Sequence, residues 1–142
     1  MRAVLDPNVI ISALLSPDGA PARIMRAWRD GAFELVASAL LLAELERALA
    51  YPKLRRRIPS SAAAEFVAWL REEADLVDDP GLPPGLRSVD PGDDYLIALA
   101  ADQRVALVSG DKHLLVLADR LPVLTPAQFC DLLAERDPTS GL

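Results

Sequence analysis

Residues 2–15, RAVLDPNVIISALL, predict a strand that ends at Asp6 and turns directly into a helix. Val4 and Leu5 form a continuous apolar run, which is typical of a parallel strand covered on both faces. Open α/β sheets bind their ligands beyond the carboxyl ends of the strands, and Asp6 stands at such an end. Asp followed by Pro is also typical of a helix N-cap, so Asp6 alone does not establish a functional site.

The rest of the chain alternates between strand and helix patterns. We expect further strands at 33–37, 74–78, 105–109 and 122–124, and helices at 20–29, 39–50, 62–74, 91–103, 112–118 and 126–136. A proline-rich loop, 79–92, precedes the helix at 91–103. The alternation predicts an α/β fold with a mostly parallel sheet of four to five strands between two layers of helices. We expect one domain over residues 1–136 and a frayed tail at 137–142.

Composition narrows the class of protein. The chain has 142 residues, 51% of them hydrophobic, which is enough for a sizeable core. Its net charge of −6 argues against binding nucleic acid through bulk positive charge. It has no apolar run long enough to span a membrane, no signal-peptide pattern and one cysteine, Cys130. These features predict a cytoplasmic protein that binds no membrane.

A basic cluster interrupts the acidic background. It consists of Lys53, Arg55, Arg56 and Arg57. Such a cluster is either a solvated helix end or a surface that contacts the phosphates of a nucleic acid. Both interpretations stay open at this point.

Glu44 falls on the helix predicted at 39–50, beside the apolar face that Leu41, Leu45 and Ala48 form. A carboxylate at the margin of a core is costly unless it is paired or binds a cation. An ion pair with Arg47, one turn further on, is the alternative.

The segment 90–94, DPGDD, contains three acids with different expected roles. Asp90 and Pro91 fit the N-cap and first position of a helix, and Asp93 can complete a capping box. Asp94 has no such role. It shares a helix face with Ile97, Ala98 and Ala101, which we expect to pack on the sheet. The pattern therefore favours Asp94 over Asp93 as a functional acid.

Asp111 follows the strand at 105–109 and precedes the helix at 112–118, which it could cap. We expect the first and fourth strands to be neighbours where the strand order reverses, which would bring Asp6 and Asp111 together. Carboxylates gathered at one place repel each other unless cations are present. Oxygen donors without thiolate or imidazole suit Mg²⁺ or Mn²⁺, whose typical chemistry is phosphodiester cleavage.

Four stretches, in this order, resemble the motifs of PIN-domain ribonucleases. They are 4–15 (VLDPNVIISALL), 42–45 (LAEL), 90–100 (DPGDDYLIALA) and 107–115 (LVSGDKHLL). The closing stretch 124–129, LTPAQF, resembles the branch of toxins related to VapC from toxin–antitoxin modules. The resemblance extends over about residues 1–133 and rests on the order and spacing of the motifs together.

The resemblance implies a three-layer α/β/α PIN-like fold and RNA cleavage that depends on Mg²⁺ or Mn²⁺. It implies that Asp6, Glu44, Asp94 and Asp111 are the metal-binding and catalytic acids, supported by Asn8, Asp93 and Ser109. It also implies an RNA substrate, a cognate antitoxin protein and a homodimer. The cluster at Lys53 and 55–57 is the corresponding candidate for RNA contact.

Two positions depart from the family pattern. Pro7 stands where a Thr or Ser is common, which removes a hydroxyl from the neighbourhood of the metal. His113 stands where many relatives carry a further acid, so the fourth ligand depends on Asp111. Two alternatives therefore accompany the toxin hypothesis: a catalytically silent PIN-fold module that binds a partner protein, and an RNA-processing nuclease outside toxin–antitoxin systems.

Overall fold

One parallel sheet forms the centre of the molecule in the computed structural model, which describes residues 1–81, 85–88 and 90–136. The strand order is β3-β2-β1-β4-β5. Val4 of the central strand stands opposite Val36 and Leu107 of its two neighbours. The predicted parallel sheet and the predicted pairing of the first and fourth strands are confirmed. The strands are β1 (Arg2–Leu5), β2 (Glu34–Ala37), β3 (Asp75–Leu76), β4 (Ala106–Val108) and β5 (Val123–Leu124).

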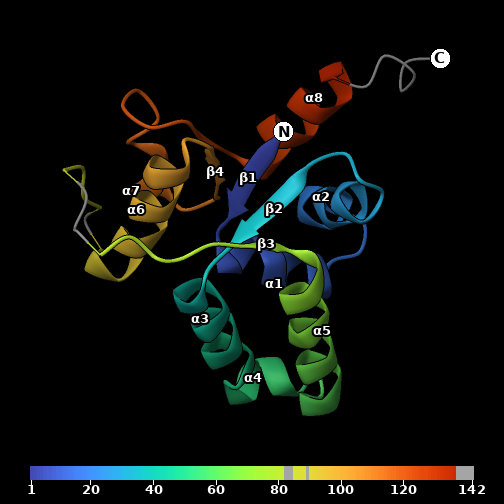
Figure 1. Ribbon diagram of the computed structural model, residues 1–142. Coiled ribbons are helices and arrows are strands. Elements are labelled where there is room, and N and C mark those ends of the chain that lie inside the picture. Colours follow the sequence, from blue (N-terminus) through green and yellow to red (C-terminus); the bar gives the residue numbers. More distant parts are fainter. Residues whose placement is uncertain (82–84, 89, 137–142) are drawn as a thin grey trace.

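Helices cover both faces of the sheet (Figure 1). The connections from β1 to β2 and from β3 to β4 run in opposite directions across the sheet. Right-handed crossovers therefore put α1 and α2 on one face and α6 on the other. The helices are α1 (Pro7–Leu15), α2 (Ala20–Arg29), α3 (Ala39–Leu49), α4 (Pro52–Arg55), α5 (Ser60–Glu73), α6 (Asp94–Gln103), α7 (Lys112–Leu115) and α8 (Pro126–Arg136), with a 3₁₀ turn, η1 (Pro91–Asp93), before α6.

Capping residues set where several helices begin. Asp6 and Ser38 accept hydrogen bonds from backbone N–H groups in the first turns of α1 and α3. The sequence analysis does not predict the short helix α4, because a proline just after the helix expected at 39–50 ordinarily marks the end of that helix. Proline is also well suited to the first turn of a helix, and Pro52 begins α4.

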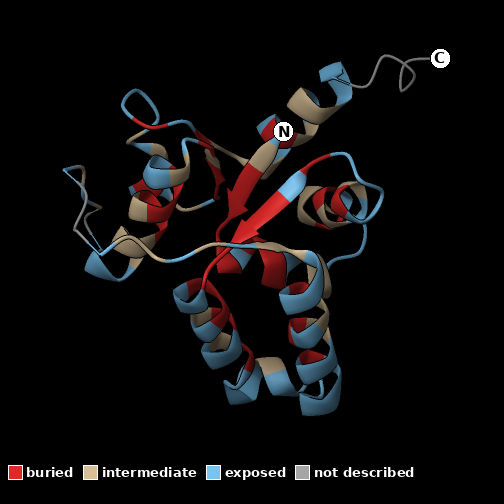
Figure 2. Cartoon of the chain, viewed as in Figure 1, coloured by how far each residue is buried: buried red, intermediate tan, exposed pale blue. Residues whose placement is uncertain are grey.

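The core lies between the sheet and the helices, and Figure 2 shows the central strands coloured as buried. Val4 and Leu5 are fully buried, as the apolar run predicts for a strand covered on both faces. Part of the predicted loop 79–92 and the predicted tail 137–142 lie outside the described residues. Within the described ranges, every helix is too short or too polar to cross a bilayer.

Helices α3, α4 and α5 form an arm that extends away from the sheet (Figure 1).

The two ends of the strands differ in their polar groups. At the amino ends, the Arg2 guanidinium donates to Asp75 Oδ2 at 2.6 Å and to Gln103 Oε1 at 3.0 Å. The carboxyl ends of the strands, where ligands bind in such sheets, are at the opposite edge.

Candidate active site

Asp6 lies at the carboxyl end of the central strand and is 5% exposed. Its Oδ1 accepts a hydrogen bond from the Asn8 N–H at 3.0 Å, which is the N-cap bond of α1. Its Oδ2 accepts from the Ser109 hydroxyl at 2.8 Å. One oxygen of Asp6 therefore caps the helix while the other faces the end of β4, so capping does not exclude a second role.

Ser109 joins the ends of the two central strands. It is fully buried, and its hydroxyl accepts from the Asp111 N–H at 3.0 Å while donating to Asp6. Asp111 in turn caps α7 through the His113 N–H at 2.9 Å. The strand pairing thus brings Asp6 and Asp111 to one edge of the sheet, as the sequence predicts, and the Ser109 hydroxyl links them.

A cavity of about 350 Å³ opens beside these two acids. Asn8 and Ser12 line it from α1, and both are exposed. Sequence analysis did not select Ser12. A signal was present, because residues four positions apart share a helix face and Asn8 was already a candidate.

The neighbouring acids Asp93 and Asp94 have different surroundings. Asp94 Oδ1 accepts from the Ser88 N–H at 2.9 Å, and its Oδ2 lies 3.4 Å from the Arg87 guanidinium. The pKa of Asp93 is raised to about 6, first by burial and then by the negative charges of Asp6, Asp90 and Asp111. The Asp93 carboxylate is therefore near the charges of Asp6 and Asp111, whereas the hydrogen bonds of the Asp94 carboxylate are with Ser88 and Arg87.

The phase of α6 explains this difference. Leu96, Ile97 and Ala100, which follow Asp93 by three, four and seven positions, are buried. Ala101, seven positions after Asp94, is exposed, and Ala98 is half-buried. Of the three residues predicted to pack on the sheet, Ile97 is buried as predicted, whereas the prediction is wrong for Ala98 and Ala101. The metal-binding role of Asp94 stays a prediction, and its carboxylate is already engaged by Ser88 and Arg87.

Glu44 lies on α3 with a side chain that is 40% exposed. The Arg47 guanidinium donates a hydrogen bond to its Oε1. The ion pair that sequence analysis named as the alternative is therefore formed. Metal binding by Glu44 stays a prediction.

Tyr95 is a residue that sequence analysis did not select. Its pKa is raised, first by burial and then by the charges of Asp6, Glu44, Asp93 and Asp79. Its hydroxyl is buried and, among the described residues, has no hydrogen-bond partner. The sequence gives no signal for Tyr95, because a tyrosine within an apolar run such as 95–100 is ordinarily part of the core.

The surroundings of the Asp6 carboxylate shift its pKa. Burial raises its pKa, the hydrogen bonds from Asn8 and Ser109 lower it, and the charge of Asp111 raises it again. The net direction is upward. Folding therefore costs more free energy for the ionised form of Asp6 than for the neutral form, and a cation nearby would offset this cost.

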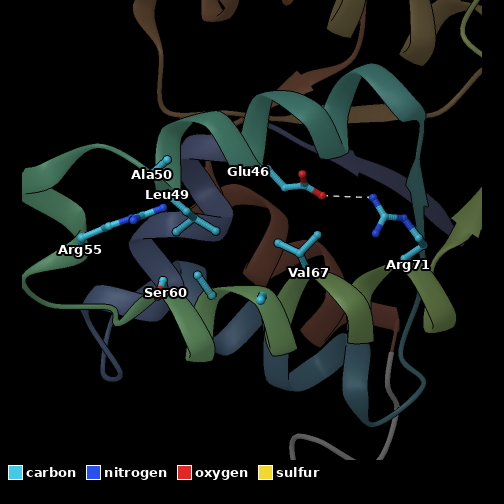
Figure 3. Close-up of a pocket in the computed structure, with 9 residues that line it drawn as sticks. Glu46, Leu49, Ala50, Arg55, Ser60, Val67 and Arg71 are labelled. Atoms are coloured by element: carbon cyan, nitrogen blue, oxygen red, sulfur yellow. Dashed lines mark hydrogen bonds and ion pairs between the residues drawn. The ribbon is translucent and has the colours of Figure 1, made fainter.

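The basic cluster of sequence analysis lies on the arm. Lys53, Arg55, Arg56 and Arg57 are all exposed. Arg55 lines one end of a groove of about 380 Å³ between α3 and α5, and the Glu46–Arg71 ion pair, at 3.1 Å, crosses its other end (Figure 3). Leu49 and Val67 line the groove between these ends. No acid from the edge of the sheet lines this groove.

Comparison with known proteins identifies the family. The PIN domain profile matches residues 2–113, which include all the acids discussed above. The chain belongs to the PIN-domain family. An uncharacterized protein of Methanocaldococcus jannaschii is 25% identical over 141 residues, covering 92% of this chain and 90% of that protein.

Solved structures share the fold of this PIN domain. VapBC2 from Rickettsia felis, bound to a DNA fragment from its promoter, has a TM-score of 0.56 at 14% identity, covering 88% of this chain and 97% of the other. VapBC-1 from nontypeable Haemophilus influenzae has a TM-score of 0.58 at 17% identity, with coverages of 89% and 99%. FitAcB from Neisseria gonorrhoeae has a TM-score of 0.54 at 20% identity, with coverages of 88% and 98%. The predicted PIN-like α/β/α fold is confirmed.

The donors of this PIN domain fit a hard divalent cation by their chemistry. Asp6, Asp93 and Asp111 offer carboxylate oxygens, and Asp93 Oδ2 is buried with no partner among the described residues. In the positions they occupy, however, no three His, Cys, Asp or Glu side chains of the described ranges are grouped tightly enough to hold a metal ion. Binding therefore requires these carboxylates to turn toward a common point.

The two departures from the family pattern have structural counterparts. Pro7 is buried at the first position of α1, and its side chain has no hydroxyl to offer the site. The His113 side chain is 56% exposed, and its Nδ1 lies 3.9 Å from Asp111 Oδ1. Among the residues after β4, the carboxylate next to the site is therefore that of Asp111.

Proposed function

We propose that this PIN domain is a ribonuclease that requires Mg²⁺ or Mn²⁺, and that it is the toxin of a toxin–antitoxin pair. The observation that supports this most strongly is the approach of Asp6, Asp93 and Asp111 at the carboxyl edge of the sheet. Three carboxylates near one another, one of them buried, are costly without a cation. The family match and the fold shared with VapBC complexes support the same conclusion.

Asp6, Asp93 and Asp111 are the residues that we propose to hold the cation. A bound divalent cation polarises a phosphodiester and lowers the pKa of a water molecule, which is the chemistry that hydrolysis requires. The Ser109 hydroxyl holds the carboxylate of Asp6 next to the backbone of Asp111, because it bonds to both. Asn8 and Ser12 line the adjoining cavity and can donate hydrogen bonds to a phosphate or a sugar.

Glu44 and Asp94 have a different part in this proposal. Each carboxylate is engaged by an arginine, Glu44 by Arg47 and Asp94 by Arg87. We infer that they act around the three central acids, and that Glu44 joins them if its bond to Arg47 opens. The exposed cluster at Lys53 and 55–57 is the proposed contact for RNA phosphates away from the cleavage point.

The proposed partners are cytoplasmic RNA, an antitoxin protein and a second copy of the chain. An antitoxin that covers the carboxyl edge of the sheet would block access to Asp6 and its cavity. A gene for a small DNA-binding protein beside the gene for this chain would support the toxin assignment. Its absence would favour an RNA-processing nuclease.

The test compares neighbouring acid variants for cleavage of single-stranded RNA with Mn²⁺ and with EDTA. We expect Asp6→Asn and Asp93→Asn to abolish cleavage without loss of fold, and Asp94→Asn to reduce it less. Asp102→Asn is the matched control, because Asp102 lies on the exposed face of α6. Equal cleavage in EDTA would refute cation dependence. A wild-type chain with neither cleavage nor stabilisation by Mn²⁺ would favour the silent binding module.

A further inference from the structure

A cavity of about 690 Å³ lies at the amino ends of β2 and β3, opposite to the edge of the sheet that carries the proposed cation site. Glu34 and Asp75, the first residues of these strands, line it. So do the carboxyl-terminal ends of α2 and α5, because each of these helices leads into one of the two strands. Cavities of this size bind drug-sized ligands. It is therefore a candidate site for a ligand other than the proposed cation and RNA.

Both tryptophans of the chain, Trp28 from α2 and Trp69 from α5, line this cavity. Their ring centroids are 4.8 Å apart, and the ring planes meet at 53°. Trp28 is 8% exposed, and its indole N–H has no hydrogen-bond partner among the described residues. This N–H keeps some exposure, because the fully buried polar atoms without partners in the described ranges belong to Asp79, Asp93 and Tyr95. The cavity therefore offers a ligand aromatic surface and an unused donor.

The carboxylates that line the cavity differ in their partners. The Arg2 guanidinium donates to Asp75 and lies 3.8 Å from Glu34, so these two acids have a counter-ion. The Glu73 side chain is exposed and forms no ion pair or hydrogen bond with the described residues. Glu73 is also the last residue of α5, where the helix dipole favours a cation over an anion. Its carboxylate is therefore an uncompensated negative charge beside the two indole rings.

A guanidinium group matches these features. It is planar, it stacks on aromatic rings and it forms strong hydrogen bonds with carboxylates. Arg29 also lines the cavity, but its Nε lies 4.0 Å from Asp30 Oδ1 and it forms no ion pair with Glu73. An arginine within a polypeptide adds backbone carbonyl groups, which can accept a hydrogen bond from an indole N–H. A peptide that contains arginine therefore complements the rings, the carboxylate and the donor together.

We propose that this cavity binds an arginine side chain in a peptide segment of a partner protein. The guanidinium packs against the rings of Trp28 and Trp69 and pairs with Glu73. A carbonyl oxygen of the segment accepts a hydrogen bond from the Trp28 N–H. The volume leaves room for residues on either side of the arginine. The inference goes beyond the proposed function and does not depend on it, because no acid of the proposed cation site lines the cavity.

The experiment titrates the full chain with the peptide N-acetyl-Gly-Arg-Gly-amide and follows tryptophan fluorescence, because both tryptophans line the cavity. We expect a saturable change with a Kd below about 1 mM. Glu73→Gln should raise this Kd about fivefold, because it removes the charge that pairs with the guanidinium. Glu72→Gln is the matched control and should leave the Kd unchanged, because Glu72 is adjacent on α5, exposed and outside the cavity. The Tm of each variant checks that its fold is kept.

Two further ligands decide what the cavity recognises. N-acetyl-Gly-Gln-Gly-amide should cause no saturable change, because it lacks the cation. Argininamide has the guanidinium without flanking residues, so it should bind more weakly than the peptide.

Four results would overturn the proposal. They are no saturable response to the arginine peptide below about 10 mM, equal binding of the glutamine peptide, the same Kd for Glu73→Gln as for wild type, and equal losses in Glu73→Gln and Glu72→Gln. Binding of argininamide as tight as that of the peptide would overturn the peptide segment as the ligand and assign the cavity to a free small cation.

Discussion

Replacing Asp93 by Asn removes a carboxylate whose ionised form lowers the free energy of unfolding. The Asp93 pKa is raised from 3.8 to about 6, first by burial and then by nearby carboxylates. The folded chain therefore binds this proton more tightly than the unfolded chain does. Stability is lost as the pH rises through the interval from about 4 to about 6, and the full cost of the ionised group is present above it.

The size of the effect follows from this shift. About two pKa units correspond to about 3 kcal/mol for a fully buried group. Asp93 is only half-buried, and solvent screening reduces the figure to about 1 kcal/mol. Asp93→Asn should therefore raise the free energy of unfolding by about 1 kcal/mol near pH 8 in EDTA, and raise Tm by about 3 °C. The gain should be small near pH 4, where the folded wild-type carboxyl is protonated and the unfolded one titrates, and it should vanish below about pH 3, where both are protonated.

Urea unfolding followed by the fluorescence of Trp28 and Trp69 measures this difference across pH, with Asp102→Asn as the exposed control. Adding Mn²⁺ should reverse the order, because ligand binding stabilises the wild type and the variant lacks a proposed ligand. Two results would refute the reasoning. One is a variant less stable than wild type near pH 8 in EDTA. The other is a gain of the same size near pH 4.

Three further predictions concern other parts of the molecule. Ser109→Ala should lower the free energy of unfolding by about 3 kcal/mol in urea titrations, because it leaves the buried Asp6 Oδ2 and the half-buried Asp111 N–H without their partner; a loss below about 1 kcal/mol would contradict this. Arg2→Met should cost about 1 kcal/mol without moving the Mn²⁺ midpoint, because Arg2 lies at the opposite end of the sheet; a shifted midpoint would show that the two ends are coupled. Replacing the arginines at 55–57 by Gln should reduce the slope of log K for RNA binding against log salt by about 2, and an unchanged slope would locate the phosphate contacts elsewhere.

Local chemistry in the sequence was sufficient for the main elements of the fold. Helical apolar patterns, with Gly31 after one helix and Pro126 at the start of the other, predicted α2 and α8 with their observed bounds. The alternation of strands and helices predicted the parallel pairing of β1 with β4. The ion pair of Glu44 with Arg47 was open to the same reasoning, because residues three positions apart on a helix are neighbours wherever the helix lies.

Contacts between distant segments were beyond such reasoning. The register between β1 and β4 determines that Ser109 bonds to both Asp6 and Asp111. The surroundings of Tyr95 depend on where α3 and the chain after β3 lie relative to α6. No local pattern specifies these positions, because loops set them and packing of the whole core stabilises them.

The amino-acid sequence by itself determined that this chain forms a parallel α/β sheet with acids at the ends of its strands. Only the tertiary structure decided that Asp93 is near the charge of Asp6, while the adjacent Asp94 is engaged by Ser88 and Arg87. The six residues 96–101, LIALAA, are all apolar, so their pattern does not say which side of the helix is inside. Packing of α6 against β1 and β4 turns Leu96 and Ala100 inward, and Asp93 lies on that same side.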